Sequence, residues 1–191
     1  TAYDNAEDKM PTLGSDNGLT LADLTGKAYD DPMWDQLLDQ MSFEDMSLLV
    51  NLGGWQTAQI DSVGKVATSD CDGPAGVNNF ITGTYGTPYP TEVLMAQTWN
   101  TDLLYDLGLA MGQEYADVNN YGVYGPAMNT HRSAFAGRNF EYYSEDGVLA
   151  GKLAAAQVNA MATKGTYNYI KHFALNDQET NRCAFLLTYS N

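Results

Sequence analysis

The sequence predicts an α/β protein in which parallel strands alternate with helices. Short runs of apolar and β-branched residues begin near positions 63, 121 and 167, and segments with apolar residues at spacings of three and four lie between them. This alternation is typical of a parallel sheet covered by helices. A complete eight-stranded barrel needs about 250 residues, so a chain of 191 residues corresponds to the first half of a (β/α)8 barrel, about four strand-helix units.

The amino-terminal part divides at residue 31. Residues 1–31 are polar and rich in Gly and Asp without sustained periodicity, which predicts a linker or wrapping arm ahead of a barrel portion at 32–191. Pro32 suits a first helical turn, and the apolar stripe behind it predicts a helix to about Gln40. Ser42 with Asp45 resembles a capping box that opens a second helix, ending at Gly53.

The remaining elements follow from the same periodicities. Asn100 or Thr101 caps a strong helix, and Ser144 opens an Ala-rich one that stops at Gly165. The predicted strands are Val63–Ser69, a weak candidate at Glu92–Gln97, Tyr121–Ala127 and Tyr167–Phe173, with loops at 70–76, 82–90 and 128–143. A loop as long as the last of these is usually functional.

Composition restricts the function class. The chain is 44% hydrophobic, which fits a globular protein, and it carries a net charge of −15. This acidity argues against nucleic acid and anionic membranes as partners, whereas a neutral sugar is compatible. No apolar run approaches the length of a membrane span. An acidic, cysteine-poor chain is consistent with a secreted or periplasmic bacterial enzyme, although the compartment stays open.

The scarce cations gather in one part of the chain. All three Arg and both His lie between His131 and Arg182. Arg makes directional hydrogen bonds, so this clustering indicates recognition of an oxygen-rich ligand. Lys171 and His172 stand side by side where a strand runs into a polar loop, and they can serve one cavity only if the strand alternation breaks there. A buried cation with its counter-ion beside a structural His is the alternative.

Three motifs carry a resemblance. They are Asp72-Gly73-Pro74-Ala75-Gly76-Val77, the run Gly137 to Asp146 (GRNFEYYSED) and the run Lys171 to Arg182 (KHFALNDQETNR). Together they resemble glycoside hydrolase family 3, the β-glucosidases and their relatives, from about Asp35 to Asn191. The resemblance implies the N-terminal part of a TIM-type barrel and retaining hydrolysis of β-linked glucosides or related sugars.

The resemblance also implies roles for single residues. The sugar-binding residues it assigns are Asp72, Arg138, Lys171, His172 and Arg182. Glu141 and Glu179 are expected to orient the sugar-binding cations, and His131 is expected to support the loop. The nucleophile Asp and the acid/base Glu are expected beyond Asn191, so no catalytic residue is assigned in this chain, and the isolated chain is predicted to be inactive.

Two features leave alternatives open. Asp72 precedes Gly73 and Pro74, residues typical of turns, so forming a turn is the alternative to binding a sugar. Many β-glucosidases of the family carry an Arg where this chain has Asn78, which leaves the sugar specificity open. A non-catalytic carbohydrate-binding or structural protein on the same fold is the alternative function.

Other chemistries lack a motif. The spacing of His131, His172, Asp72 and Glu141 fits no compact metal site, and neither a phosphate-binding glycine loop nor a nucleophile elbow is present. We therefore expect no metal and no cofactor. Expected partners are a carbohydrate and the remainder of the same polypeptide or a complementing chain. Pairing of Cys71 with Cys183 stays open. Half a barrel should also leave one helix face partly uncovered, that of Leu149, Leu153, Ala156, Val158 and Met161.

Overall fold

The computed structural model describes residue 7, residues 9–173, residue 176 and residues 179–180. The chain forms two compact units, Thr1–Thr68 and Ser69–Asn191. Within the described residues no helix is both long and apolar enough to traverse a lipid bilayer.

Short helices build the first unit. Its elements are the 3-10 helix η1 (Leu21–Leu24), α1 (Met33–Leu38), α2 (Phe43–Asn51), the short strand β1 (Gln56–Thr57) and the 3-10 helix η2 (Asp61–Val63). Leu24, Leu37 and Ile60 are buried together in its core. The predicted capping box of Ser42 and Asp45 is present at the start of α2. The prediction of an arm at residues 1–31 stays a prediction, although Leu24 contributes to this core.

Three parallel strands form the centre of the sheet in the second unit. Its order is β4-β3-β2-β5-β6, with β2 (Thr68–Asp72), β5 (Asn120–Tyr124) and β6 (Tyr167–Asn168) parallel. The antiparallel strands β3 (Asn78–Asn79) and β4 (Thr84–Tyr85) form a hairpin beside β2. The parallel strands place their carboxyl ends along one edge of the sheet, where sites are usually built.

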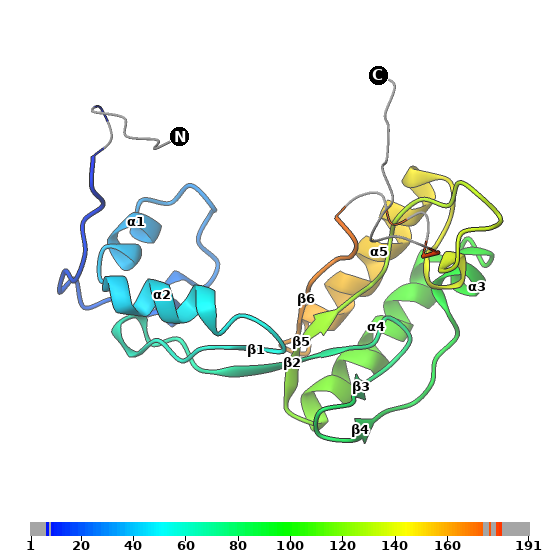
Figure 1. Ribbon diagram of the computed structural model, residues 1–191, viewed down its shortest axis with the longest axis horizontal. Helices are drawn as coiled ribbons and strands as arrows, with labels where there is room; N and C mark the ends of the chain where they lie inside the picture. Colours follow the sequence, from blue (N-terminus) through cyan, green and yellow to red (C-terminus); the bar gives the residue numbers. More distant parts are fainter. Residues whose placement is uncertain (1–6, 8, 174–175, 177–178, 181–191) are drawn as a thin grey trace. The chain divides into compact units, whose positions relative to one another are not determined.

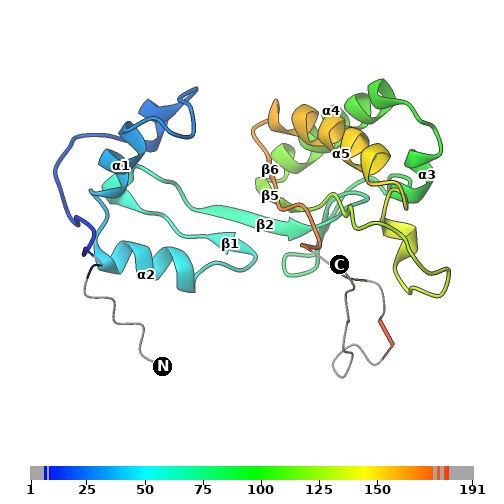
Figure 2. The same ribbon diagram turned by 90° about the horizontal axis from the view of Figure 1, so that it is seen from above.

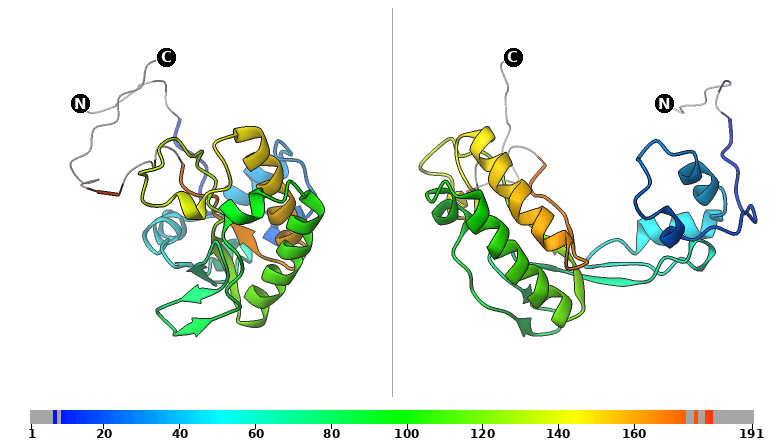
Figure 3. Two further views of the ribbon diagram at one scale, coloured as in Figure 1. Left: turned by 90° about the vertical axis from the view of Figure 1, so that its right-hand side faces the viewer. Right: turned by 180° about the vertical axis from the view of Figure 1, so that it is seen from behind.

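Two long helices cover this sheet. α4 (Thr101–Asp117) precedes β5 and α5 (Gly147–Ala162) precedes β6, and they lie side by side (Figures 1 and 2). The side chain of Asn100 caps α4, and that of Asp146 caps α5. A view from behind shows the two helices packed along most of their length (Figure 3). The connections therefore have the strand-helix-strand form that the sequence predicts.

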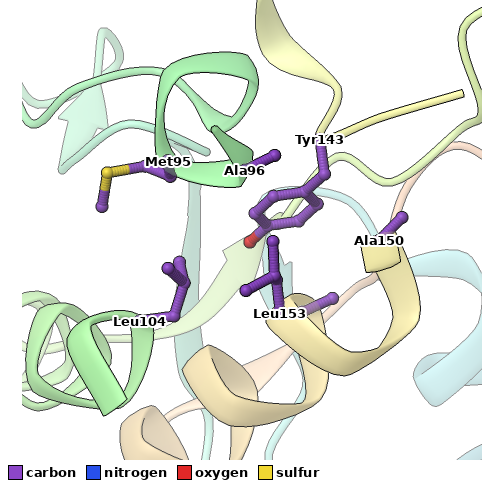
Figure 4. Close-up of a cluster of buried hydrophobic side chains, with 7 residues drawn as sticks. Met95, Ala96, Leu104, Tyr143, Ala150 and Leu153 are labelled. Carbon is purple, nitrogen blue, oxygen red and sulfur yellow. The ribbon is translucent and has the colours of Figure 1, made fainter. Parts of the chain in front are cut away.

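The second unit has two hydrophobic clusters. In one, the ring of Tyr143 lies among Ala96, Leu104 and Leu153, so that α3 (Glu92–Ala96), α4 and α5 meet (Figure 4). The other joins Cys71 and Val123 of the strands to α4 and α5. The members of this second cluster are Cys71, Val77, Met111, Tyr115, Val123 and Met161.

Two expectations from the sequence are wrong, and a third is wrong in part. Residues 92–96 form a helix rather than a strand, because Thr91 provides an extended N-cap and only Val93 in the segment is β-branched. The first strand is Thr68–Asp72 rather than 63–69, since Gly64 turns the chain with φ 63°. On the face expected to lack cover, Leu153 and Met161 are fully buried, whereas Leu149, Ala156 and Val158 are only partly buried.

The polar residues of β2 explain why periodicity misplaced this strand. Asp70 is 2% exposed, and its carboxylate accepts hydrogen bonds from the hydroxyls of Tyr167 (2.6 Å) and Tyr169 (3.0 Å). These donors come from residues 97 and 99 positions further along the chain. A buried carboxylate in a strand is tolerated only with such partners, and a local pattern does not reveal them.

Candidate functional site

A cavity of about 490 Å³ lies at the carboxyl end of the parallel strands. Three segments far apart in sequence line it: the end of β2 with the following hairpin, the 3-10 helix η3 (Asn139–Glu141) with Arg138, and Lys171 after β6. The polar lining includes Asp72, Asn78, Arg138, Glu141 and Lys171. The cavity therefore collects side chains from all three sequence motifs.

The loop after Asp72 is fixed from behind by α4. The hydroxyl of Tyr115, which is fully buried, lies 2.9 Å from the carbonyl oxygen of Gly73 and 3.2 Å from that of Gly76. Both glycines have positive φ, and a Cβ on Gly73 would lie 1.8 Å from the carbonyl oxygen of Gly76. Only glycine fits there, so the Asp-Gly-Pro motif sets the position of Asp72 through backbone geometry.

An alternating chain of charges spans the cavity wall. Lys171 Nζ lies 2.8 Å from Asp72 Oδ1 and 3.9 Å from Glu141 Oε2. Glu141 also accepts a hydrogen bond from Arg138 Nε, and Arg138 Nη1 lies 3.3 Å from Glu179 Oε1. Burial lowers the pKa of Arg138, but the hydrogen bond and charge of Glu141 leave it above the ordinary value. The carboxylates thus hold the two cations in position, and both cations still line the cavity.

His172 belongs to a second polar cluster centred on Tyr142. Its Nδ1 lies 2.8 Å from the Tyr142 hydroxyl, and its backbone N–H donates to Asn129 Oδ1 at 2.6 Å. Asn176 donates to the same hydroxyl. Burial and the neighbouring charges of Arg138 and Lys171 lower the pKa of His172, so its ring is neutral at neutral pH. The peptide bond between Lys171 and His172 is cis.

The predicted site residues separate into groups. Asp72, Arg138, Lys171 and Glu141 line the cavity, whereas His172 is not among its lining residues. Glu179 contacts Arg138, and His131 Nε2 lies 2.7 Å from the carbonyl oxygen of Tyr142. Arg182 and Cys183 lie outside the described residues. The assignment of the predicted site residues, Arg182 included, as substrate-binding or supporting residues stays a prediction.

Sequence reasoning missed three residues at this site. Tyr142 and Asn129 position His172, and only the Tyr142 position fell inside a quoted motif. Glu92, at the start of α3, is 2% exposed, and its Oε1 lies 3.5 Å from the backbone nitrogen of Ala127 while its Oε2 has no hydrogen-bond partner. Burial raises the pKa of Glu92 to about 8. The sequence analysis placed Glu92 in a weak strand and gave it no role at the site.

Metal and thiol chemistry find no support here. The part of the chain that the structure describes contains no group of three or more His, Cys, Asp or Glu side chains that could hold a metal ion. Cys71 is fully buried, and burial raises the pKa of its thiol to about 11. What the cavity offers is charged donors beside carboxylate acceptors, an arrangement suited to a ligand with several adjacent hydroxyl groups.

Sequence comparison identifies relatives of this chain. The model of the Glycosyl hydrolase family 3 N terminal domain matches residues 56–182. Beta-glucosidase A of Butyrivibrio fibrisolvens is 41% identical over 156 residues, covering 78% of this chain and 19% of that protein. A beta-glucosidase of Rhizobium radiobacter is 33% identical over 154 residues, with 78% and 19% coverage. The chain thus spans about a fifth of the length of these curated relatives.

Solved structures share the fold. Beta-glucosidase 3B from Thermotoga neapolitana in complex with glucose matches with a TM-score of 0.65 and 36% identity, covering 78% of this chain and 24% of that one. A beta-glucosidase from Paenibacillus barengoltzii matches with a TM-score of 0.69 and 28% identity, covering 90% and 20%.

Proposed function

The chain belongs to glycosyl hydrolase family 3, and on that premise we propose that it supplies the sugar-gripping half of a glycosidase active site. Its fold is the first part of the TIM-type barrel that the sequence predicts. The proposed reaction is retaining hydrolysis of β-linked glucosides or related sugars. The proposed partner of the chain is the remainder of a longer polypeptide or a complementing chain that completes the barrel.

One observation carries the proposal. Lys171, Asp72, Glu141 and Arg138 form a continuous set of ion pairs along one cavity, although they come from three separate segments. A buried pair alone would serve stability poorly, because desolvation offsets much of its attraction. Side chains that are paired and still line a cavity of about 490 Å³ are better explained by a ligand that shares their hydrogen bonds.

Each residue that lines the cavity receives a role from its geometry. Asp72 accepts from sugar hydroxyls with the oxygen that Lys171 leaves free. Lys171 and Arg138 donate charge-assisted bonds, and bonds that shorten as the sugar ring flattens lower the barrier. Glu141 and Glu179 orient Arg138. His172 keeps its sugar-binding role by sequence resemblance, and Tyr142 fixes its neutral ring through Nδ1. Arg182 completes the set by sequence resemblance.

The catalytic carboxyl pair is assigned elsewhere. Retaining hydrolysis uses two carboxyl groups about 5 Å apart, one as nucleophile and one as acid/base. Asp72 and Glu141 are the nearest counter-ions of Lys171 and Arg138, so using either as a nucleophile would take the closest carboxylate away from a partly buried cation. We therefore propose that both catalytic carboxyls lie in sequence beyond Asn191.

The test uses the longest natural polypeptide that contains this sequence. We expect it to hydrolyse an aryl β-glucoside, and ¹H NMR should show the β-anomer of the sugar as the first product. The Lys171→Met variant should lose most activity while unfolding at a similar temperature, since Met keeps the apolar stem. A protein that binds glucose but hydrolyses no β-glycoside would instead favour the non-catalytic alternative, and release of the α-anomer first would exclude retention.

A further inference from the structure

Three cross-strand neighbours form a row on the cavity wall. Asp72 of β2 lies opposite Asn78 of β3, and Asn78 lies opposite Tyr85 of β4. Residues directly opposite each other on antiparallel strands place their side chains on the same face. All three line the same cavity. We propose that Asn78 and Tyr85 form a second subsite, which holds a ring linked to the sugar gripped at Asp72. This inference rests on the proposed function.

The strand order sets the distance between the two subsites. Neighbouring strands lie about 4.8 Å apart, so Tyr85 stands roughly 10 Å from Asp72 across the sheet. Lys171 follows β6, on the opposite side of β2 from β3 and β4. A sugar bound between Asp72 and Lys171 therefore leaves Asn78 and Tyr85 beside whatever ring is attached to it.

The two ends of the cavity differ in chemistry. The charged lining residues are Asp72, Arg138, Glu141 and Lys171, whereas every lining residue from the hairpin is uncharged, namely Val77, Asn78, Tyr85, Gly86, Thr87 and Pro88. Tyr85 is 67% exposed, so its ring does not serve the core. An accessible aromatic ring can cover the C–H face of a sugar or stack on an aryl group, and a nearby amide can hydrogen-bond to hydroxyls.

The hairpin is fixed in place before any ligand binds. Gly86 donates to the Val77 carbonyl at 3.0 Å, and Thr87 donates its backbone N–H to Glu114 Oε2 at 2.9 Å. The hydroxyl of Tyr89 donates to the other oxygen of Glu114 at 2.9 Å. Glu114 belongs to α4, so this side of the cavity is attached to the helix layer. A preorganised surface loses little entropy when a ring binds to it.

The test compares ligands with and without a second ring in the longest natural polypeptide containing this sequence. Methyl β-glucoside has no second ring, whereas cellobiose carries one. Release of intact cellobiose from nitrophenyl β-cellobioside requires that the second ring be bound on the non-leaving side. Tyr85→Ala should lower kcat/KM for cellobiose, or its affinity by calorimetry if the protein hydrolyses neither ligand, about 3- to 10-fold and leave methyl β-glucoside unchanged. Tyr85→Phe should retain the wild-type preference, and Tyr29→Ala, at a fully exposed tyrosine, is the matched control.

The kinetic results assign the side of the second ring. A Tyr85→Ala loss in kcat/KM for cellobiose hydrolysis places the subsite under the leaving group, and a loss confined to release of intact cellobiose places it at the far end of the sugar. Equal losses for methyl β-glucoside and cellobiose, or no loss for either, overturn the inference while the hydrolase stands. A protein that hydrolyses nothing but still prefers cellobiose through Tyr85 supports the subsite and refutes the proposed activity. Binding of neither ligand overturns both.

Discussion

At the scale of single residues, Arg138 gives the most direct test of the charge network. Its guanidinium reaches Glu141 through Nε and Glu179 through Nη1, which needs a planar fork. Arg138→Lys keeps the charge but cannot hold both carboxylates and a sugar, so kcat/KM for an aryl β-glucoside should fall by about 10- to 1,000-fold. Arg132→Lys, in the same loop but outside this cavity, is the control. Equal kcat/KM values for Arg138→Lys and the wild type would refute the role of Arg138.

Glu92 predicts a pH dependence of stability. Its pKa is about 8 in the folded protein, against an ordinary value of 4.5, because the carboxyl is buried. The folded state therefore binds more protons than the unfolded state between these values. The contribution of Glu92 to stability is fully present below pH 4.5, is lost as pH rises towards 8, and is on the order of a few kcal/mol in total.

Replacement by Gln removes the titrating group and keeps its shape. We expect the unfolding free energy of Glu92→Gln to gain on the wild type progressively from pH 5 to pH 9, measured by denaturant titration at each pH. Glu44→Gln, at an exposed carboxyl, should follow the wild type. A constant difference between Glu92→Gln and wild type over this range would show that Glu92 is ionised throughout.

At the scale of elements, the contact between α4 and α5 depends on glycine. A Cβ on Gly108 would lie 2.4 Å from the carbonyl oxygen of Gln157 and 2.8 Å from Ala160 Cβ, so Gly108→Ala must push the helices apart. We expect a loss of about 1–3 kcal/mol in unfolding free energy. Gly151→Ala in α5 meets no atom within 4 Å and should stabilise the protein by about 0.5–1 kcal/mol. The opposite order of the two variants in denaturant unfolding would contradict this packing.

The long helices were predictable because their signals are local. The cap at Asn100 and a steady apolar spacing mark α4 and α5 without tertiary information. The start of α5 lies later than predicted, because Asp146 rather than Ser144 caps the helix. The short strands were not predictable, since β3 and β4 are two residues each and exist through pairing with β2. The sequence also indicated strand character for 92–96, where packing of Met95 and Ala96 against α5 favours a helix.

The site shows the same division. Three motifs in the sequence identified Asp72, Arg138, Lys171 and Glu141, and the structure brings these four to one cavity. The partners that position them are non-local. Tyr115 reaches the loop after Asp72 from α4, and Asn129 reaches His172 across 43 residues, so neither contact has a signal in sequence spacing. Tyr85 lines the cavity because β4 pairs with β3, whereas the sequence analysis predicted a loop at 82–90.

At the scale of the whole molecule, the sheet ends on an open strand. β6 is the last strand in the sheet order, and no described strand pairs with its other edge. Two of the residues that follow it are apolar and exposed, Ile170 at 52% and Phe173 fully. An unpaired edge beside exposed apolar side chains favours association with further chain. Beta-glucosidase A of Butyrivibrio fibrisolvens, of which this chain spans 19%, has ample sequence to cover such an edge.

This open edge predicts different behaviour for the 191-residue chain and for a longer polypeptide that contains it. Expressed alone, the chain should bind a hydrophobic dye, self-associate in sedimentation and hydrolyse no aryl β-glucoside, because both the covering strands and the proposed catalytic carboxyls are missing. The longer polypeptide should bind less dye per residue, unfold cooperatively and show activity. Ile170→Lys should reduce self-association of the short chain, whereas Val50→Lys, at an even more exposed apolar residue of the first unit, should not. A short chain that is monomeric, cooperative and active would mean that these residues already contain a complete hydrolase, and the catalytic carboxyls would then have to be sought among Asp72, Glu92 and Glu141.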